Sequence, residues 1–462
     1  MPASATRSFS NADPRVRYHD IRDALQELQL RPSKGLGQNF LRDANIARLI
    51  ATTAVPQGSP FALEIGPGLG AITAHLLGIC RQVLALEKDA RLADWLRRKL
   101  PEGRGLTVET ADAVTYDWRP LMIHGPFPLI GNLPYYVTSP VLRNFLGPVS
   151  PAARAVFGVQ DEFAVRMSAK PGTADYSALT VRLQRLWSIS RERSLGPGVF
   201  FPEPAVSSAI VVLEPLPPRT YPPVRAAFFD DIVQRGFSQR RKQLRNLIEI
   251  EPEKWGEWCN RHAVPPTCRA ENLSVAQWVD LAAAMDPAAA TVAQHDHELF
   301  DVVDEHNRVL RTAPRCEVHG QNLRHRSVHV LIFNAAGELL LQKRSAWKDR
   351  EPLKWDSSAA GHLDSGEDYA RAAARETEEE LGVQSNLESV GRISASAETG
   401  HEFVEVFTGI HEGPFVLPPA EVEAAEFFEP ATIDQWMRSR PGDFAPGFRE
   451  TWRLYSETAR RR

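Results

Sequence analysis

Two segments of the chain carry residue types and spacings that could perform chemistry. In EIGPGLGAIT (64–73), an apolar run enters a glycine-rich turn, and Gly66, Gly68 and Ala71 fit the loose fingerprint of a dinucleotide-binding loop. In GHLDSGEDYARAAARETEEELGV (361–383), three glutamates follow a glycine with helical spacing. Residues three and four apart share a helical face, and clustered carboxylates repel unless a cation neutralises them. The first segment therefore predicts a cofactor site and the second a divalent-metal site.

Polar residues also end the three apolar segments that follow the glycine turn. Glu87 comes 21 residues after Gly66, where an acid can accept hydrogen bonds from ribose hydroxyls of a nicotinamide or an adenosyl cofactor. Asp112 could reach an adenine amino group, and Asn132 begins NLPYY (132–136). Each residue alone could be a simple cap. Because the carboxyl ends of parallel strands share one sheet edge, together they predict one ligand site.

The NLPYY segment favours the adenosyl cofactor. An exocyclic adenine nitrogen is a poor nucleophile because its lone pair is delocalised into the ring. The Asn132 side chain and the backbone carbonyl on the Pro134 side could accept its two hydrogens and direct the lone pair toward a methyl donor. Tyr135 offers a flat face on which an extruded base can stack. The structural alternative is a proline turn with a core tyrosine.

Several motifs in order resemble the ribosomal RNA adenine N6-dimethyltransferases of the KsgA/RsmA type, over roughly residues 30–285. The motifs are GLGQNFLRD (35–43), EIGPGLG (64–70), NLPYYVTSPVL (132–142), QDEFAVRMSAKPGTADYSAL (160–179), FFPEPAVSSAIV (200–211) and FSQRRKQLRNLI (237–248). The resemblance implies a class I, Rossmann-like fold that binds S-adenosyl-L-methionine. The implied cofactor contacts are Asn39, Leu41, Gly66, Glu87, Asp112 and Asn132.

The same resemblance implies the substrate. The family acts on two adjacent adenosines in a hairpin loop near the 3′ end of small-subunit (16S) rRNA, whose single-stranded bases splay out easily. Phe201 would flank the target adenine opposite Tyr135. Tyr136 departs from the family pattern, which usually has Asn after NLPY. This change is expected to alter the pocket wall and to leave the hydrogen-bonding residues in place.

The elements that must position this site alternate between strand-like and helix-like runs. Short apolar segments at 61–66, 83–88, 106–112, 127–132 and 155–160 are bounded by turn residues. ARLADWLRRKL (90–100) has helical periodicity. The alternation predicts an α/β fold with a mostly parallel sheet covered by helices.

Two breaks divide the chain. EPLPPRTYPP (214–223) contains five prolines, and AMDPAAATVAQHDH (284–297) has no sustained apolar pattern. We expect a methyltransferase catalytic domain at 1–215 and a small helical RNA-contacting domain at 216–288. A third domain is expected at 289–462, after a linker at about 284–297.

Charge is distributed unevenly between these parts. Residues 291–462 have 20 basic and 30 acidic residues, a net of −10, which leaves 34 and 28, a net of +6, for residues 1–290. Four basic residues crowd a helical pattern in the second part: Arg240, Arg241, Lys242 and Arg245. RNA phosphate neutralisation is the functional interpretation, and a solvated helix face is the alternative. The overall net charge of −4 therefore does not exclude a nucleic-acid partner.

The second segment resembles the Nudix box, G-x5-E-x7-R-E-U-x-E-E-x-G-U, where U is a bulky apolar residue. Its fixed positions are Gly361, Glu367, Arg375, Glu376, Glu379, Glu380 and Gly382, and Thr377 departs at the first U. The resemblance covers about 297–455, including strand-like runs at 326–334, 337–345 and 401–410. It implies an α/β/α sandwich that hydrolyses a diphosphate-containing small molecule.

Hard oxygen ligands suit Mg²⁺ or Mn²⁺, so Glu376, Glu379 and Glu380 are the predicted metal ligands, with Glu376 and Glu379 also expected to act in catalysis. Arg375 is expected to orient a carboxylate through a bidentate pair. A separate apolar stripe is expected to pack on a sheet. The stripe comprises Ala370, Ala373, Ala374, Thr377 and Leu381. A surface acidic helix is the alternative, but it does not explain the glycines or the arginine.

Within that superfamily, the third part is most similar to the branch that contains isopentenyl-diphosphate isomerases and their hydrolase-like relatives. DVVDEHNRVL (301–310), HRSVHVLIFN (325–334) and KWDSSAAGH (354–362) carry this similarity. The isomerases place a reactive cysteine just before the Gly-His of the box. This chain has Ser357-Ser358-Ala359-Ala360 there, which favours hydrolysis over isomerisation.

Other sequence features narrow the class of protein. The four cysteines lack CxxC spacing, which suits a reducing cytosol. We expect no membrane span and no secretory signal, and therefore a cytoplasmic protein. The resemblance to the methyltransferases implies that it acts as a monomer. Two alternatives stay open: a ribosome-assembly factor that chiefly binds RNA on immature 30S subunits, and a catalytically silent, regulatory Nudix module.

Overall fold

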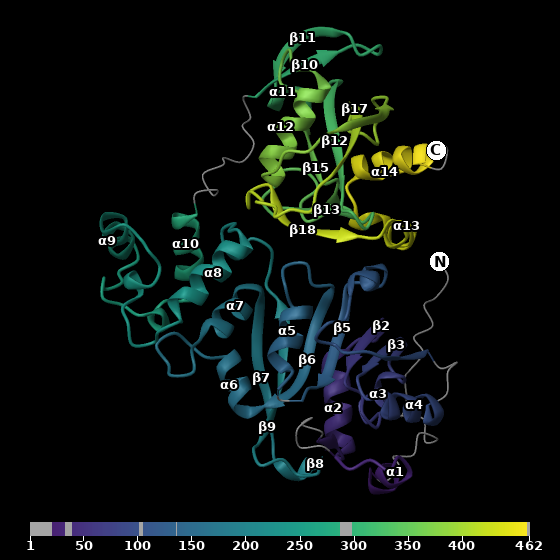
Figure 1. Cartoon of the computed structure of the whole chain (residues 1–462), viewed down its shortest axis with the longest axis vertical. Coiled ribbons are helices and arrows are strands. Elements are labelled where there is room, and N and C mark those ends of the chain that lie inside the picture. The colour runs from purple at the N-terminus through teal and green to yellow at the C-terminus, as the bar shows by residue number, and fades with distance from the viewer. Residues whose placement is uncertain (1–20, 33–38, 101–104, 135, 287–297, 460–462) are drawn as a thin grey trace, which may run out of the picture. The chain divides into compact units, whose positions relative to one another are not determined.

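A computed structural model describes residues 21–32, 39–100, 105–134, 136–286 and 298–459 (Figure 1). The chain packs as two compact units, Met1–Leu216 with Arg269–Val275 and Pro217–Cys268 with Ala276–Arg462. The three sequence-derived domain ranges stay predictions, and most of the expected linker lies outside the described residues. All four cysteines are free thiols. Across the described ranges, no helix is both long enough and apolar enough to cross a membrane.

A seven-stranded sheet forms the core of the first unit, with the strand order β4-β3-β2-β5-β6-β9-β7. The parallel strands are β2 (Ser59–Ile65), β3 (Cys80–Glu87), β4 (Leu106–Thr110), β5 (Phe127–Asn132) and β6 (Ala152–Gln160). Toward one edge, β9 (Ser208–Pro215) pairs antiparallel with β6 and with the edge strand β7 (Trp187–Leu195), so β7 runs in the same direction as β6. The central strands are apolar because both of their faces are covered. This arrangement confirms the predicted Rossmann-like α/β fold.

Helices pack along this sheet (Figure 1). They are α2 (Ala44–Ala54), α3 (Thr73–Leu76), α4 (Ala90–Lys99), α5 (Thr138–Phe145), α6 (Asp161–Met167) and α7 (Ala178–Leu186). The carboxylate of Asp43 caps α2 by accepting hydrogen bonds from the backbone amides of Asn45 and Ile46. The N-terminal segment adds α1 (Ile21–Glu27) and the short strand β1 (Phe40–Leu41), which pairs with β8 (Phe200–Phe201).

The helical part that follows contains α8 (Ala226–Gly236), the 3-10 turn η3 (Leu244–Asn246), α9 (Pro252–Arg261) and α10 (Val275–Met285). Here the expected helix over residues 240–245 is wrong, because α8 ends at Gly236 and a turn precedes η3. A Cβ on Gly236 would come within 2.4 Å of the Trp278 ring, so tertiary packing governs this end of the helix. The backbone amide of Leu244 then bonds to the carbonyl of Cys268 at 2.9 Å and holds the new direction.

The C-terminal part is built on a second seven-stranded sheet. Its path is β14 (Trp355–Asp356), β13 (Leu339–Arg344), β12 (His325–Phe333), β17 (Glu402–Ile410) and β16 (Glu388–Ile393), with β15 (Ala359–His362) on β12 and β18 (Val422–Phe428) on β13. Two further strands, β10 (Leu299–Val303) and β11 (Val309–Pro314), form a hairpin. The helices are α11 (Arg315–Gly320), α12 (Tyr369–Leu381), α13 (Pro430–Ser439) and α14 (Pro446–Ala459). Figure 1 shows α12 and α14 on opposite sides of the strands, as an α/β/α sandwich requires.

Helix α12 carries the glutamates of the second predicted site. The carboxylate of Asp368 caps its first turn by accepting from the amide of Arg371, and Gly382 ends it in the left-handed region at φ +69°. The buried face comprises Ala372, Ala373, Glu376, Thr377, Glu380 and Leu381. Ala370 and Ala374 are exposed, so the predicted separate apolar stripe is wrong at these two positions. The sheet covers two of the carboxylates together with the small residues.

Candidate functional site

The glycine turn after β2 is held in a conformation that favours glycine. Gly66, Gly68 and Gly70 have φ angles of +66°, +57° and +81°. A Cβ on Gly66 would meet no atom within 4 Å, whereas one on Gly68 would come within 3.2 Å of the Phe40 ring. The backbone at Gly66 is therefore open to a ligand, and Gly68 permits close approach of the N-terminal segment.

Glu87, the last residue of β3, is tied to this turn. One carboxylate oxygen accepts a hydrogen bond from the amide of Gly68 at 3.0 Å, and the other accepts from the amide of Asp89 at 2.9 Å. Burial raises the pKa of Glu87. The two bonds fix the carboxylate beside the turn and leave further lone pairs for hydroxyl donors.

Asp112 lies two residues beyond β4 rather than on the strand. Its carboxylate accepts from the Lys88 ammonium at 2.7 Å and from the amide of Val114 at 3.0 Å. The bond from Lys88 holds the pKa of Asp112 below its usual value. An ionised carboxylate therefore stands after the third parallel strand, as expected, with a lysine partner that the sequence analysis did not single out.

Asn132 ends β5 and joins the N-terminal segment to the site. Its side-chain Nδ2 donates a hydrogen bond to the backbone carbonyl of Asn39 at 3.2 Å. In the short sheet that follows, Phe40 pairs with Phe201 and Leu41 with Phe200. Three of the predicted cofactor contacts and the predicted base-flanking phenylalanine are thus brought to one region.

The carbonyl of Pro134 is engaged within the turn that leads to α5. It accepts from the amide of Val137 at 3.1 Å and from the hydroxyl of Thr138 at 3.2 Å. A base-binding role for this carbonyl would have to share it with those donors. Tyr135 lies outside the described residues, so its predicted stacking role stays a prediction.

A buried carboxyl group near the turn was missed by sequence reasoning. Glu64 lies in β2 and is 1% exposed, and its Oε2 has no hydrogen-bond partner among the described residues. Burial raises its pKa to about 7. The available signal was an acid inside an otherwise apolar strand.

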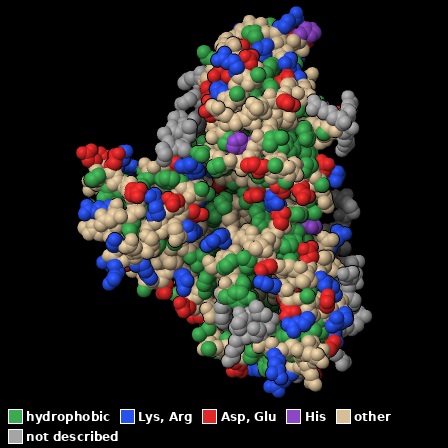
Figure 2. Space-filling model, viewed as in Figure 1, with side chains coloured by type: hydrophobic (Ala, Val, Ile, Leu, Met, Phe, Trp, Pro, Cys, Tyr) green, Lys and Arg blue, Asp and Glu red, His purple; other side chains and the backbone are tan. Residues whose placement is uncertain are grey.

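The predicted RNA-contacting residues are all exposed. Arg240, Arg241 and Lys242 lie in the turn after α8, and Arg245 lies in η3. Figure 2 shows basic and acidic side chains interspersed on the visible face of this helical part, rather than one continuous basic surface. The four residues therefore form a local basic turn rather than a basic helix face.

In the C-terminal part, Arg375 organises the acidic residues of the box. Its Nε and Nη2 donate to the two oxygens of Glu367 at 3.1 and 2.9 Å, which is the predicted bidentate pair. Its Nη1 donates to Glu376 at 2.7 Å and to Glu379 at 3.1 Å. One guanidinium therefore positions three carboxylates.

The three predicted metal ligands differ in their surroundings. Glu376 and Glu380 are buried, whereas the Glu379 side chain is 57% exposed. Burial, together with the nearby charge of Glu380, raises the pKa of Glu376 to about 8. Glu380 accepts from the amide of Ala360 and from the side chain of Gln342, both at 2.9 Å. A divalent cation would relieve this crowding of carboxylates.

Gly361 leaves the space that Glu376 occupies. A Cβ at this position would lie 2.0 Å from Cδ of Glu376. The glycine of the box is therefore required by packing against a carboxylate, and not by its backbone conformation.

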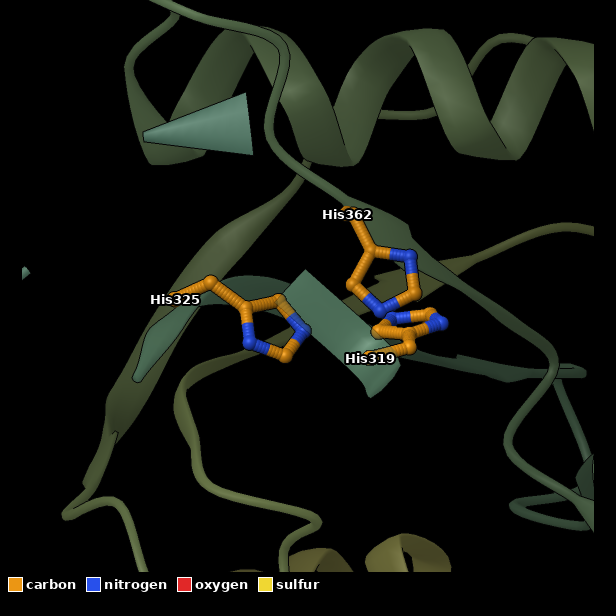
Figure 3. Close-up of side chains that lie close together, drawn as sticks. All are labelled: His319, His325 and His362. Atoms are coloured by element: carbon orange, nitrogen blue, oxygen red, sulfur yellow. The ribbon is translucent and has the colours of Figure 1, made fainter. Parts of the chain in front are cut away.

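A cavity of about 960 Å³ connects these groups. Its wall contains the box glutamates and several cations, among them Arg315, Arg344, Lys348 and Arg350. Oxygen ligands for a metal and cations for phosphate therefore share one cavity. The wall also includes Glu402, His319 and His362, which sequence analysis did not single out. Figure 3 shows the side chains of the two histidines beside that of His325.

Comparison with known proteins agrees with both halves of this description. Residues 30–286 match the family model "Ribosomal RNA adenine dimethylase", and residues 323–448 match the NUDIX domain model. The ribosomal RNA small subunit methyltransferase A of Bordetella bronchiseptica is 38% identical over 262 residues, which cover 56% of this chain and 95% of that protein. The protein of the same name from Anaeromyxobacter sp. is 37% identical over 280 residues, covering 57% and 97%. The crystal structure of the 23S rRNA methyltransferase ErmE, at 29% identity, covers 54% of this chain and 99% of that one with a TM-score of 0.44.

Proposed function

Because the chain belongs to the ribosomal RNA adenine dimethylase family through residues 30–286 and carries a NUDIX domain at 323–448, we propose that it is a bifunctional enzyme. The first activity is dimethylation of N6 on two adjacent adenosines, in a hairpin near the 3′ end of small-subunit rRNA on immature 30S subunits. The second is hydrolysis of a diphosphate-containing small molecule. We expect a cytoplasmic monomer.

The residues at the carboxyl edge of the first sheet fit S-adenosyl-L-methionine. Gly66 leaves open space at the turn, and the Glu87 carboxylate is fixed beside it by the amide of Gly68. With Asp112 beyond the next strand, these groups suit a ligand that offers hydroxyl and amino hydrogens. Asn39, Leu41 and Asn132 would complete its binding site. When bound, this cofactor supplies the methyl group and leaves as a neutral thioether.

The observation that best supports the first activity is the hydrogen bond from the Asn132 side-chain amide to the Asn39 backbone carbonyl. Since Nδ2 already donates there, the amide presents Oδ1 as a hydrogen-bond acceptor. That oxygen would bind a hydrogen of the adenine amino group and hold its lone pair in position. Phe201 and Tyr135 would hold the base between two rings. Positioning supplies most of the rate, and no covalent enzyme intermediate is needed.

The first activity is tested with the full chain, immature small subunits and S-adenosyl-L-methionine. Mass spectrometry of digested rRNA should show N6,N6-dimethyladenosine at two adjacent positions. Tight RNA binding without this product would favour the assembly-factor alternative.

The observation that carries the second activity is the link from Arg375 to Glu367, Glu376 and Glu379 beside the buried Glu380. Mg²⁺ or Mn²⁺ fits this oxygen-rich set, and Glu376, Glu379 and Glu380 would hold it. When bound, the ion supplies charge neutralisation and a more acidic water. The arginines and lysine of the cavity wall would orient the phosphates.

The second activity is tested with a panel of nucleoside and non-nucleoside diphosphates in the presence of Mg²⁺. We expect phosphate release from at least one compound, abolished by a chelator. Ligand binding without turnover on the whole panel would favour the silent-module alternative.

A further inference from the structure

One histidine in the cavity wall of the C-terminal part has a ring nitrogen that makes no hydrogen bond within the described ranges. His329, in β12, lines the cavity and is 6% exposed. Its Nδ1 lies 2.7 Å from the hydroxyl oxygen of Ser357. Nε2 is therefore the atom that this ring can offer to a ligand in the cavity.

The hydroxyl of Ser357 fixes the tautomer of this ring. Ser357 is 0% exposed, and across the described residues its hydroxyl has no hydrogen-bond partner other than Nδ1 of His329. A buried hydroxyl that does not donate leaves its hydrogen unsatisfied, which is costly. The hydroxyl therefore donates to Nδ1, and the neutral ring carries its own hydrogen on Nε2. Burial lowers the pKa of His329, which keeps the ring neutral near pH 7.

The first turn of α14 leaves the Nε2 side of the ring open. Gly447, the second residue of α14, also lines the cavity, and a Cβ there would come within 3.2 Å of Nε2 of His329. The backbone of Gly447 is helical, so its conformation does not require glycine. The first amides of an α-helix have no acceptor within the helix and carry partial positive charge. The Nε2–H of His329 thus lies beside the amino end of a helix.

The cations of the same wall are shared with carboxylates. Arg344 donates to Asp356 at 3.0 Å, and the Lys348 ammonium contacts Glu421. A purely structural histidine is the simpler explanation for a buried ring, but that role requires neither an open Nε2 nor a glycine beside it. A hydrogen-bond donor at a helix start suits an anionic oxygen. The charge of Glu402, which also acts on the ring, would be offset by the Mg²⁺ that accompanies a diphosphate.

We propose that Nε2–H of His329, beside the first turn of α14, donates a hydrogen bond to a phosphate oxygen of the diphosphate substrate. His329 lies opposite Ala360 in the pairing of β12 with β15, and the amide of Ala360 donates to Glu380 of the box. The histidine and the box therefore flank the same residue, so one diphosphate can contact both. This inference rests on the proposed diphosphate substrate, but not on its hydrolysis.

The test measures binding rather than turnover. The full chain with Mg²⁺ is titrated calorimetrically with methylenediphosphonate, a diphosphate analogue that has no bridging oxygen. His329→Leu removes the donor and should lower the affinity at least about ten-fold, as expected for one hydrogen bond to a charged group. His329→Gln keeps a donor close to the position of Nε2 and should retain most of the affinity. A purely structural role of the ring would not produce this difference.

Two glycine variants provide an independent check. Gly447→Ala places a methyl group over Nε2 without changing the histidine, and it should also weaken binding. Gly256→Ala, in α9, is the matched control, because a Cβ there meets no atom within 4 Å. Thermal unfolding of each variant checks its folding.

The outcomes separate this inference from the proposed hydrolysis. Affinity within about two-fold of the unsubstituted chain in His329→Leu, or in Gly447→Ala if His329→Leu does not fold, would overturn the inference. Absence of binding by the unsubstituted chain would also overturn it. Binding that depends on His329 without turnover of any diphosphate would support the inference and contradict the proposed hydrolysis.

Discussion

The side-chain amide of Asn132 donates a hydrogen bond to the backbone carbonyl of Asn39, 3.2 Å away. The bond joins the end of β5 to the segment before β1, which are 93 residues apart in the chain. It also sets the amide orientation, so that Oδ1 is the acceptor atom of this side chain. One side chain therefore links two segments that we predict to contact the cofactor and the target base.

Removal of charge from the basic turn should weaken RNA binding. Changing Arg240, Arg241, Lys242 and Arg245 to glutamine should lower affinity and flatten the dependence of log K on log salt, because each lost phosphate contact removes roughly 0.7–0.9 from the slope. Filter binding across a salt series measures this. Arg308→Gln with Arg453→Gln, in exposed positions of the C-terminal part, serves as control. An unchanged slope would show that these four residues form a solvated surface and do not contact RNA phosphates.

Glu379→Gln should stop diphosphate hydrolysis and leave methylation intact. Glu379 is one of the three proposed metal ligands and accepts from Arg375. We expect a loss of at least 100-fold in kcat, on the order of that caused by removal of one charge-stabilising group from an active site. Glu378→Gln, one residue away on α12 and exposed, is the matched control. Equal activity of the two variants would contradict the proposed metal site.

Gly361→Ala should impair hydrolysis through packing. The new methyl group would lie 2.0 Å from Cδ of Glu376, so that carboxylate must move. Overpacking of this kind costs about 1–3 kcal/mol. We expect a lower kcat/KM with retained methylation. Gly442→Ala, where a Cβ meets no atom within 4 Å, should be silent. Full activity of Gly361→Ala would show that Glu376 is not held where the site needs it.

The metal-free C-terminal part should lose stability as pH rises from about 5 to 8. The pKa of Glu376 is raised to about 8 in the folded chain, above its ordinary value, so the folded state binds more protons over this window. Stability therefore falls with rising pH. Calorimetry in a chelator should show a falling Tm for the transition that Mg²⁺ shifts, and a flatter profile for Glu376→Gln. A Tm that rises with pH in both proteins would contradict the raised pKa.

The sequence sufficed to predict the five parallel strands of the first sheet and three strands of the second. The roles of the residues at the sheet edges stay predictions. Segments such as 127–132 are short, apolar and bounded by turn residues. The bounds predicted for these strands therefore agree closely with those of the structure. The box was identifiable because its fixed positions match a known family pattern, and the spacing of its glutamates agrees with the helical repeat. The basic residues 240–245 also fit that repeat, but Trp278 and Cys268, distant in sequence, impose a turn there. The spacing of residues within a short segment carries no information about such long-range contacts.

Four residues at and beside the cavity of the C-terminal part show the same limit more strongly. His319, His325, His362 and Glu402 come from four elements spread over more than eighty residues. No local motif links them. The pairing of β12 with β15 and β17 brings His325, His362 and Glu402 together, and α11, which packs on the β10–β11 hairpin, adds His319. Likewise, the glutamates of α12 resemble a solvent-exposed acidic run in the sequence. Glu376 and Glu380 are nevertheless buried, because the sheet covers their face of the helix, whereas Glu379 is exposed.

The central claim is that Asn132 positions the adenine amino group for methylation. The direct measurement is methyl transfer to rRNA of immature small subunits by the full chain and by Asn132→Ala, with RNA affinity measured alongside. We predict that N6,N6-dimethyladenosine formation falls at least 100-fold, on the order of the effect of removing one positioned polar group, while RNA affinity stays within about two-fold. Undiminished methylation by Asn132→Ala would contradict the account.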